Sequence, residues 1–337
     1  MPGIKKVVPA TLALIVLEMS FLDYWSYSHA YHENPAAFMD VIQHTAPAPA
    51  QYRIGVLEPA GFIMRHSHLG LRHILSTVDL ITGLIAVFTL FFLLRRTATY
   101  RNSSLTSQWF GAAVFALLVQ FYLPWVTWYQ RPETMTTVAL VALSLLLLTV
   151  RIPLGTASMV ATIAAQLLLA TAQGFVRADV TMALYAGVFL ACLTRMGDGM
   201  ALPRRVEMIV SVLAMLLAGG IQYYLSHVVY PLANYEDSPV FQLVLQFKEP
   251  ARLIAFIVFI PPYVWLIRTL IHNRIRVQGP SAAIVLASAI YMAMWWMVGR
   301  VEEVRIFMPF AIAVVPLTVA TAMELWLGER SAKFATS

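Results

Sequence analysis

The chain has 337 residues, of which 60% are hydrophobic and only 12% are charged, and its formal net charge is +6. Soluble domains carry about 25% charged residues, so this composition excludes a soluble globular protein and indicates an integral membrane protein. The apolar runs are continuous and do not alternate, which favours helices over a β-barrel, because a helix satisfies its own backbone hydrogen bonds in lipid. The single cysteine, Cys192, excludes an intramolecular disulfide and a cysteine metal cluster.

Ten apolar stretches follow one another along the chain, and each is interpreted as a helix crossing a hydrocarbon core of about 30 Å. The predicted fold class is therefore all-α, a polytopic membrane bundle of about ten transmembrane helices that forms a single domain over residues 1–337. The ten predicted spans are residues 7–23, 73–94, 108–128, 135–150, 157–175, 181–194, 206–225, 252–271, 282–299 and 305–326.

Most Lys and Arg residues fall on one side when the N-terminus is placed in the cytoplasm, so both termini are predicted to be cytoplasmic. The basic balance follows from this topology and gives no support to nucleic-acid binding. Two outer segments are long, residues 24–72 and 226–251. Asn34-Pro35 and the alternating Ala and Pro of residues 46–49 should break the first of them into short helices lying on the membrane.

Candidate catalytic carboxylates lie in the first outer segment. Asp23 follows the first span, where it can reach both water and lipid headgroups, as a general base acting on a hydroxyl would need. Asp40 lies on a short amphipathic turn between Phe38 and Ile42. The alternative interpretation makes Asp23 a helix-end residue in an aromatic belt and Asp40 part of the solvated face of an interfacial helix.

Basic residues of the same segment are candidates for binding a lipid-linked phosphate. Arg53 follows a proline-rich stretch, and a guanidinium presented from a stiff scaffold suits a phosphate. Arg65 and His66 begin a basic stretch that is interpreted as a collar for lipid headgroups. Arg53 could instead be a loop-pinning arginine. A metal site at His66 and His68 would require a third ligand that the sequence does not identify.

A second constellation stands in the outer turn between the last two predicted spans. Arg300 and Arg305 are candidate phosphate-binding residues, and Glu302 and Glu303 are candidates for orienting the phosphate or the acceptor. Four charges between two apolar helices require partners or water, so mutual pairing is the alternative. The two glutamates could also supply oxygen ligands to a divalent cation, although their spacing does not demand a metal.

Two motifs in these segments resemble the signatures of a known family. Residues 52–59, Tyr-Arg-Ile-Gly-Val-Leu-Glu-Pro, and residues 303–309, Glu-Val-Arg-Ile-Phe-Met-Pro, are similar to the paired Tyr-Arg-x-x-Leu-x-Pro and Glu-x-Arg-x-x-x-Pro signatures of bacterial polytopic proteins related to GT-C glycosyltransferases. Gly55 lengthens the first signature by one residue. The resemblance implies a GT-C-like bundle in the bacterial inner membrane.

The same resemblance implies sugar transfer from a polyprenyl-phosphate donor to a glycan, lipid or protein acceptor at the outer face. In the predicted inverting mechanism, Asp23 takes the proton of the acceptor hydroxyl, with Asp40 in reserve. Arg53 and Arg305 stabilise the departing lipid phosphate. No nucleotide-binding glycine loop is visible, which agrees with a lipid-linked donor.

Other classes of function remain open. A polymerase or ligase of lipid-linked glycans would depend on the outer arginines and tolerate loss of Asp23. A transporter or flippase would need polar groups near the midplane. The predicted spans offer a few glutamines and only two ionisable residues, Glu18 and Asp79, both nearer the outer side, which is sparse for ion coupling. A scaffold protein would tolerate replacement of Asp23, Arg53 or Arg305 as long as it folds.

Overall fold

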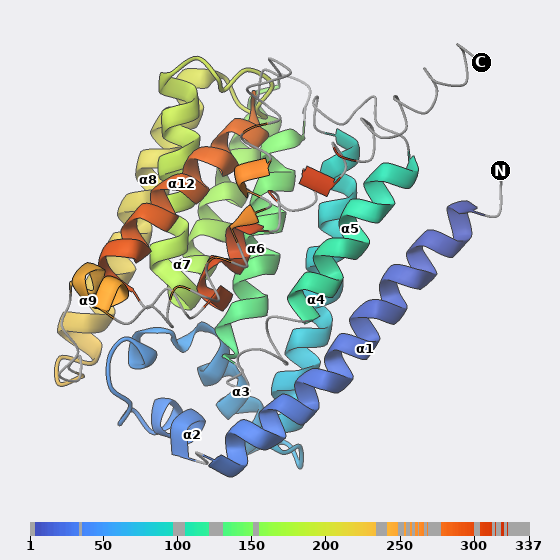
Figure 1. Cartoon of the computed structure of the whole chain (residues 1–337). Coiled ribbons are helices and arrows are strands. Elements are labelled where there is room, and N and C mark those ends of the chain that lie inside the picture. The colour runs from blue at the N-terminus through green and yellow to red at the C-terminus, as the bar shows by residue number, and fades with distance from the viewer. Residues whose placement is uncertain are drawn as a thin grey trace.

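A computed structural model describes most of the chain as a bundle of helices (Figure 1). No β-strand occurs among the described residues, in agreement with the predicted all-α class. The described ranges are 4–33, 36–96, 105–120, 131–150, 155–233, 241–248, 278–299 and 304–311, with scattered single positions between 253 and 268 and between 314 and 322.

Five described helices are long and apolar enough to cross a membrane, which supports a membrane protein. They are contained in α1 (Ile4–Glu33), α4 (Leu71–Arg96), α7 (Thr156–Leu193), α8 (Arg204–Tyr224) with its π-helical extension η3 (Leu225–Val229), and α12 (Pro280–Val298). Two shorter apolar helices, α5 (Leu105–Gln120) and α6 (Glu133–Thr149), correspond to the third and fourth predicted spans. The predicted spans 252–271 and 305–326 lie largely outside the described residues, so the number ten stays a prediction.

Helix α7 reverses direction at Arg177, where the backbone leaves helical geometry with φ −156° and ψ 91°. The Tyr185 hydroxyl donates a hydrogen bond to the Gln166 carbonyl oxygen at 3.1 Å. In a straight helix these residues would be separated by about 28 Å, so the two halves of α7 must lie side by side. We call them α7a (residues 156–176) and α7b (residues 178–193), and they match the predicted spans 157–175 and 181–194.

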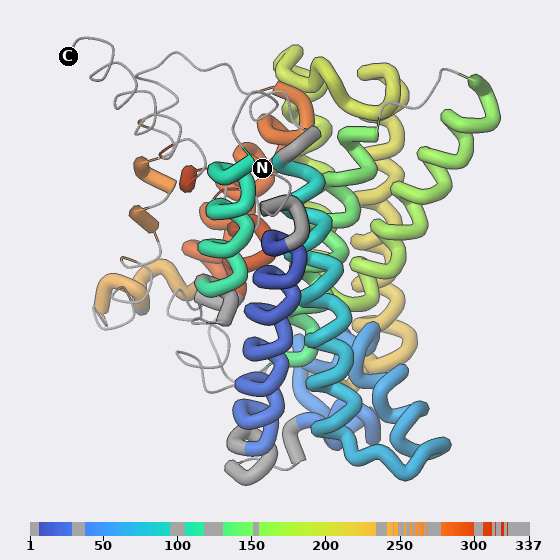
Figure 2. The backbone as a smooth tube through the Cα atoms, turned by 90° about the vertical axis from the view of Figure 1, so that its right-hand side faces the viewer, coloured from blue at the N-terminus to red at the C-terminus, as the bar shows by residue number. Residues whose placement is uncertain are grey.

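The first loop folds against one end of the bundle, which we call the loop end (Figure 2). It contains the short helices α2 (Ala36–Ile42), η1 (Ala50–Tyr52) and α3 (Ile54–His66). Helix α3 contacts α4 and α7, and the α7 reversal lies at this end. Short helices in this loop were predicted from its prolines, whereas its orientation toward the cytoplasm or the outside stays a prediction.

Helix α1 continues to Glu33, ten residues beyond the predicted end of the first span at residue 23. Residues 24–33 contain no glycine or proline, so nothing in the local sequence stops the helix. The helix ends before Asn34-Pro35, because a proline disfavours helical geometry in the residue before it. The first loop is therefore shorter than predicted, and Asp23 lies within a helix.

Small residues allow close packing around the site. Helix α7 packs mainly against α8 and α12, and α4 packs against α6 and α1. Gly187 on α7b lies so close to α12 that an added Cβ would contact the Ala287 nitrogen at 2.6 Å. This close approach positions Tyr291, one turn further along α12, beside the α7 reversal.

Candidate functional site

The residues before Arg53 hold the first loop in place. The buried Gln51 side chain accepts a hydrogen bond from the Ala46 backbone N–H at 3.0 Å and donates one to the Val41 carbonyl at 3.3 Å. The Tyr52 hydroxyl donates a 2.6 Å hydrogen bond to the carbonyl of Ala233 in the second predicted loop. The two loops therefore meet in space, a point that sequence alone could not test.

A second contact between these loops involves His44. Its ring stacks on Tyr230 with centroids 5.3 Å apart, and its Nδ1 lies 3.3 Å from the Glu58 carboxylate. Burial and the nearby Glu58 carboxylate raise the pKa of the Tyr230 phenol. Both ends of the motif at residues 52–59 thus help to fasten the loops together.

Gly55 permits α3 to approach the α7 reversal. A Cβ at this position would lie 2.7 Å from Val176 Cγ2 and 3.0 Å from the backbone atoms Phe175 C and Val176 N. Because backbone atoms cannot move aside as a flexible side chain can, only glycine fits here without displacement. Gly55 is therefore the residue of the 52–59 segment that lets Arg53 lie near Arg177.

Arg53 forms an ion pair with Glu133 at the start of α6, with 2.9 Å between Nη1 and Oε1. Their side chains are 20% and 8% exposed, respectively. A guanidinium carries five N–H donors, so this single contact leaves other donors of Arg53 available for a ligand. Arg53 is thus both a loop-pinning residue and a partly exposed cation.

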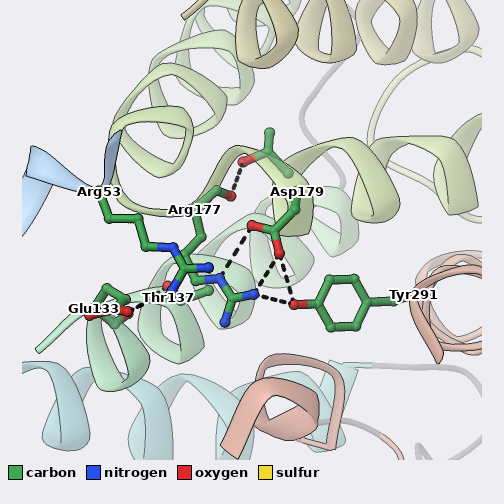
Figure 3. A network of polar contacts seen from close by, with 7 residues as sticks. Arg53, Glu133, Thr137, Arg177, Asp179 and Tyr291 are labelled. Atoms are coloured by element: carbon green, nitrogen blue, oxygen red, sulfur yellow. Dashed lines mark hydrogen bonds and ion pairs between the residues drawn. The ribbon is translucent and has the colours of Figure 1, made fainter. Parts of the chain in front are cut away.

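Arg177, at the α7 reversal, is bound by Asp179 and by Tyr291 of α12 (Figure 3). Its Nε and Nη2 donate to the two Asp179 carboxylate oxygens at 3.2 and 2.5 Å. The Tyr291 hydroxyl accepts from Arg177 Nη2 at 2.5 Å and donates to Asp179 Oδ2 at 3.0 Å. Such a bidentate pair fixes both groups in one geometry and stabilises the ionised carboxylate.

Aromatic side chains support this network from one side. The Arg177 guanidinium carbon lies 5.7 Å from the centroid of the Trp295 ring. Phe307 in the short helix η4 (Val304–Phe307) and Phe310 after it lie 6.4 and 4.8 Å from the Tyr291 ring. The described part of the segment at residues 303–309 therefore packs directly on the network.

A cavity of about 490 Å³ opens beside these residues at the loop end. Volumes of about 300–1,000 Å³ are usual for small-molecule sites. Its polar lining comes from the first loop, the α7 reversal and neighbouring glutamines, and its apolar lining comes from α7 and α12. The lining residues are Pro49, Tyr52, Arg53, Val176, Arg177, Ala178, Asp179, Met182, Gln222, Gln242, Met294, Trp295 and Val298.

Asp23 lies away from the cavity, in a buried position on α1, which packs against α4. Its side chain is fully buried, as is that of Asp79, and the two carboxylates interact electrostatically. The Tyr27 hydroxyl donates a 2.7 Å hydrogen bond to Asp79 Oδ2. Asp23 does not line the cavity, so any role as a base would require another approach for the acceptor.

The remaining candidates of the first loop lie away from the cavity. Asp40 is half-buried in α2, and its backbone carbonyl accepts hydrogen bonds from Thr45 and Ala46. Arg65 and His66 are exposed at the end of α3, where the His66 ring packs on Phe62 with centroids 4.2 Å apart. Their exposure agrees with a headgroup-binding collar and does not test it.

The candidates near the C-terminus are only partly described. Arg300, Glu302 and Glu303 lie outside the described residues, and only the backbone of Arg305 is described, within η4. Within the described part of the chain, no three His, Cys, Asp or Glu side chains are grouped to hold a metal ion. The divalent cation at Glu302 and Glu303 stays untested.

Sequence reasoning missed four residues that shape this site: Glu133, Arg177, Asp179 and Tyr291. A signal for two of them existed, because Arg177-Ala178-Asp179 interrupts two apolar runs in which charges are otherwise absent. Tyr291 carried no such signal, since a tyrosine in a predicted span is ordinary.

Comparison with protein-family models, curated proteins and solved structures finds no match for this chain.

Proposed function

We propose that the cavity binds a polyprenyl-phosphate-linked sugar and that the protein transfers this sugar to an acceptor at the outer face of the membrane. The observation that carries the proposal is the convergence of Arg53, Arg177 and Asp179 on one cavity of about 490 Å³ beside a membrane bundle. Of the two motifs that resemble those of GT-C-related proteins, the one at residues 52–59 supplies Tyr52 and Arg53 to the cavity lining, and the one at residues 303–309 places Phe307 against Tyr291.

Arg53 is the phosphate-binding residue in this proposal. Its guanidinium is partly exposed, and its ion pair with Glu133 can be exchanged for contacts to a ligand phosphate, because a guanidinium matches both groups. Glu133 then competes with the phosphate and keeps Arg53 oriented when the site is empty. The family resemblance adds Arg305 to this proposal as a second phosphate-binding residue.

Asp179 is the carboxylate best placed to act as the base. An ionised carboxylate offers about four lone-pair sites, and the contacts with Arg177 and Tyr291 occupy three of them, leaving one on Oδ1. Its side chain is 26% exposed, and it lines the cavity. Asp23 remains the base implied by family resemblance, and the two assignments make different predictions.

The proposed reaction is a single displacement that inverts the anomeric carbon. The acceptor hydroxyl oxygen forms a bond to that carbon while the bond between the carbon and the phosphate oxygen breaks. The hydroxyl proton moves to the carboxylate, and polyprenyl phosphate leaves with the bonding electrons. Arg53 stabilises the charge that develops on the departing phosphate.

The decisive experiment uses purified protein in nanodiscs with a radiolabelled polyprenyl-phosphate sugar. Binding and sugar release are measured separately for wild type, Asp179→Asn, Asp23→Asn and Arg53→Ala. We expect Asp179→Asn to retain binding and lose turnover, and Arg53→Ala to weaken binding. Arg205→Ala, at an exposed position of α8 that does not line the cavity, serves as the control. Turnover lost in Asp23→Asn but kept in Asp179→Asn would instead assign the base to Asp23.

Other results would favour a different class. Donor binding could require Arg53 while turnover requires neither Asp179 nor Asp23. That result would indicate a polymerase or ligase of lipid-linked glycans. Movement of the donor across the bilayer without chemistry would indicate a flippase. Absence of donor binding by wild type would overturn the proposal and leave the transporter and scaffold interpretations.

A further inference from the structure

A buried stripe of polar side chains runs along α7a. Thr162, Gln166, Gln173 and Arg177 are each at most 2% exposed. At about 100° per residue, their spacings of four, seven and four place them within one narrow face of the helix. This face turns toward the bundle interior, where a transmembrane helix normally presents apolar groups.

Many polar atoms along this face have no hydrogen-bond partner. Both side-chain amide atoms of Gln166 and of Gln173 are buried and unpaired, as are the Ser144 hydroxyl oxygen and both carboxylate oxygens of Glu207. Glu207, in the first turn of α8, is fully buried. The unpaired atoms come from α6, α7a and α8. Helix α7 packs against both α6 and α8, and Tyr185 of α7b lies between Ser144 and the Gln166 carbonyl, so the atoms belong to one region of the interior.

Glu207 has no cation to balance it within the described part of the chain. Its carboxylate lies close to the Gln166 amide and to the Leu202 backbone, although neither contact has full hydrogen-bond geometry. It also interacts electrostatically with Tyr185 and Cys192 of α7b. Arg204, one turn before it on its own helix, donates instead to the Leu193 carbonyl at 3.0 Å. Helix α6 contributes Ser144 to this region, and this side chain is uncharged, so it cannot balance Glu207.

A dry interior is a poor explanation for this arrangement. An isolated ionised carboxylate is strongly destabilised in an apolar medium, and an unpaired buried amide is also unfavourable. Internal water removes both penalties, because one molecule makes about three hydrogen bonds to buried polar groups. Protonation of the carboxyl group removes its charge as well.

We propose that α6, α7a and α8 enclose a water-binding column that ends at Glu207, and that the Glu207 carboxyl group binds an exchangeable proton. The column continues from Gln166 through Gln173 toward Arg177, a rise of about 16 Å along α7a. Its Arg177 end adjoins the sugar-donor cavity, whereas Glu207 does not line that cavity, and the proposal does not depend on the proposed transferase activity. The ligands of this site are water and a proton.

Infrared spectroscopy of the protein in nanodiscs tests the proposal without any substrate. We expect wild type to show a protonated-carboxyl stretch that is lost in Glu207→Gln, a variant that keeps size and hydrogen-bonding groups. On transfer to D₂O this band should shift well before the backbone amides of the bundle exchange. Asp79→Asn is the matched control, because it removes a different buried carboxyl and should leave the Glu207 band intact.

Two outcomes would overturn the proposal. Identical carboxyl bands in wild type and Glu207→Gln would mean that Glu207 is ionised. A band that shifts only as slowly as the core amides exchange would mean that the region is dry. If Glu207→Gln does not fold, the D₂O shift is compared between wild type and Gln173→Leu, where loss of a water-binding amide should slow it and an unchanged rate would count against the column.

Discussion

The two buried polar regions of this bundle differ in how their groups are paired. At the loop end, Arg177 and Asp179 are bound to each other and to Tyr291, and Arg53 faces Glu133. In the interior between α7a and α8, Gln166 and Glu207 have side-chain atoms with no described hydrogen-bond partner. The first arrangement is preorganised by protein alone, whereas the second needs water or protons to be complete.

This difference indicates different tasks. Paired charges with a few remaining donors and acceptors hold a site in one geometry, ready for an anionic ligand. Unpaired polar atoms in a closed interior attract small, mobile ligands such as water. Substitutions that break pairs at the loop end should therefore lower the free energy of unfolding strongly, and substitutions in the column should change it little.

Arg177→Met should have the largest effect. It leaves the Asp179 charge without its bidentate partner, and breaking a buried pair in this way costs about 3–5 kcal/mol of unfolding free energy. Steric trapping in bicelles measures this quantity. The double variant Arg177→Met, Asp179→Leu is the control and should recover part of the loss. A loss below about 1 kcal/mol in the single variant would show that the pair is not structural.

Gly55→Val should cause the second-largest loss of unfolding free energy. The added side chain meets the backbone of Phe175 and Val176, and overpacking of this kind costs about 1–3 kcal/mol. Because α3 would shift, Arg53 should also lose its position and binding of the polyprenyl-phosphate donor should weaken. Gly219→Ala is the matched control, since nothing lies within 4 Å of its added Cβ. Equal stability of the two variants would contradict the close approach.

The Arg53–Glu133 pair should show a smaller coupling. A double-mutant cycle with Arg53→Ala and Glu133→Ala should give an interaction energy between about 0.5 and 3 kcal/mol, because the residues are in direct contact. Unfolding of the four proteins in the same micelles measures it. Additive single effects would mean that Glu133 does not hold Arg53 in the empty site.

Gln173→Leu should change the unfolding free energy least, by less than about 1 kcal/mol. If water satisfies the amide, the substitution exchanges hydrogen bonds to water for apolar contact, and the two nearly balance. A dry amide predicts a different sign: removing two unpaired polar atoms would then stabilise the protein. A clear gain in stability would show that the amide is dry and would contradict the hydrated column.

Much of the bundle could be predicted from hydropathy alone. Continuous apolar runs require helices in lipid, and the break between residues 175 and 181 appears as the α7 reversal. The end of α1 was placed ten residues early, because hydropathy reports where lipid ends and not where a helix ends. Asn34-Pro35 was the more reliable signal for that boundary.

The sequence by itself determined the all-α membrane class, and it singled out Arg53, which the structure brings to the lining of a cavity. Tertiary structure alone decided which charges meet. Arg53 reaches Glu133 across 80 residues and Arg177 reaches Tyr291 across 114, whereas Asp23 turns inward to Asp79. The physical reason is that hydropathy records the environment of each residue separately, while ion pairs depend on how helices distant in the chain rotate and pack.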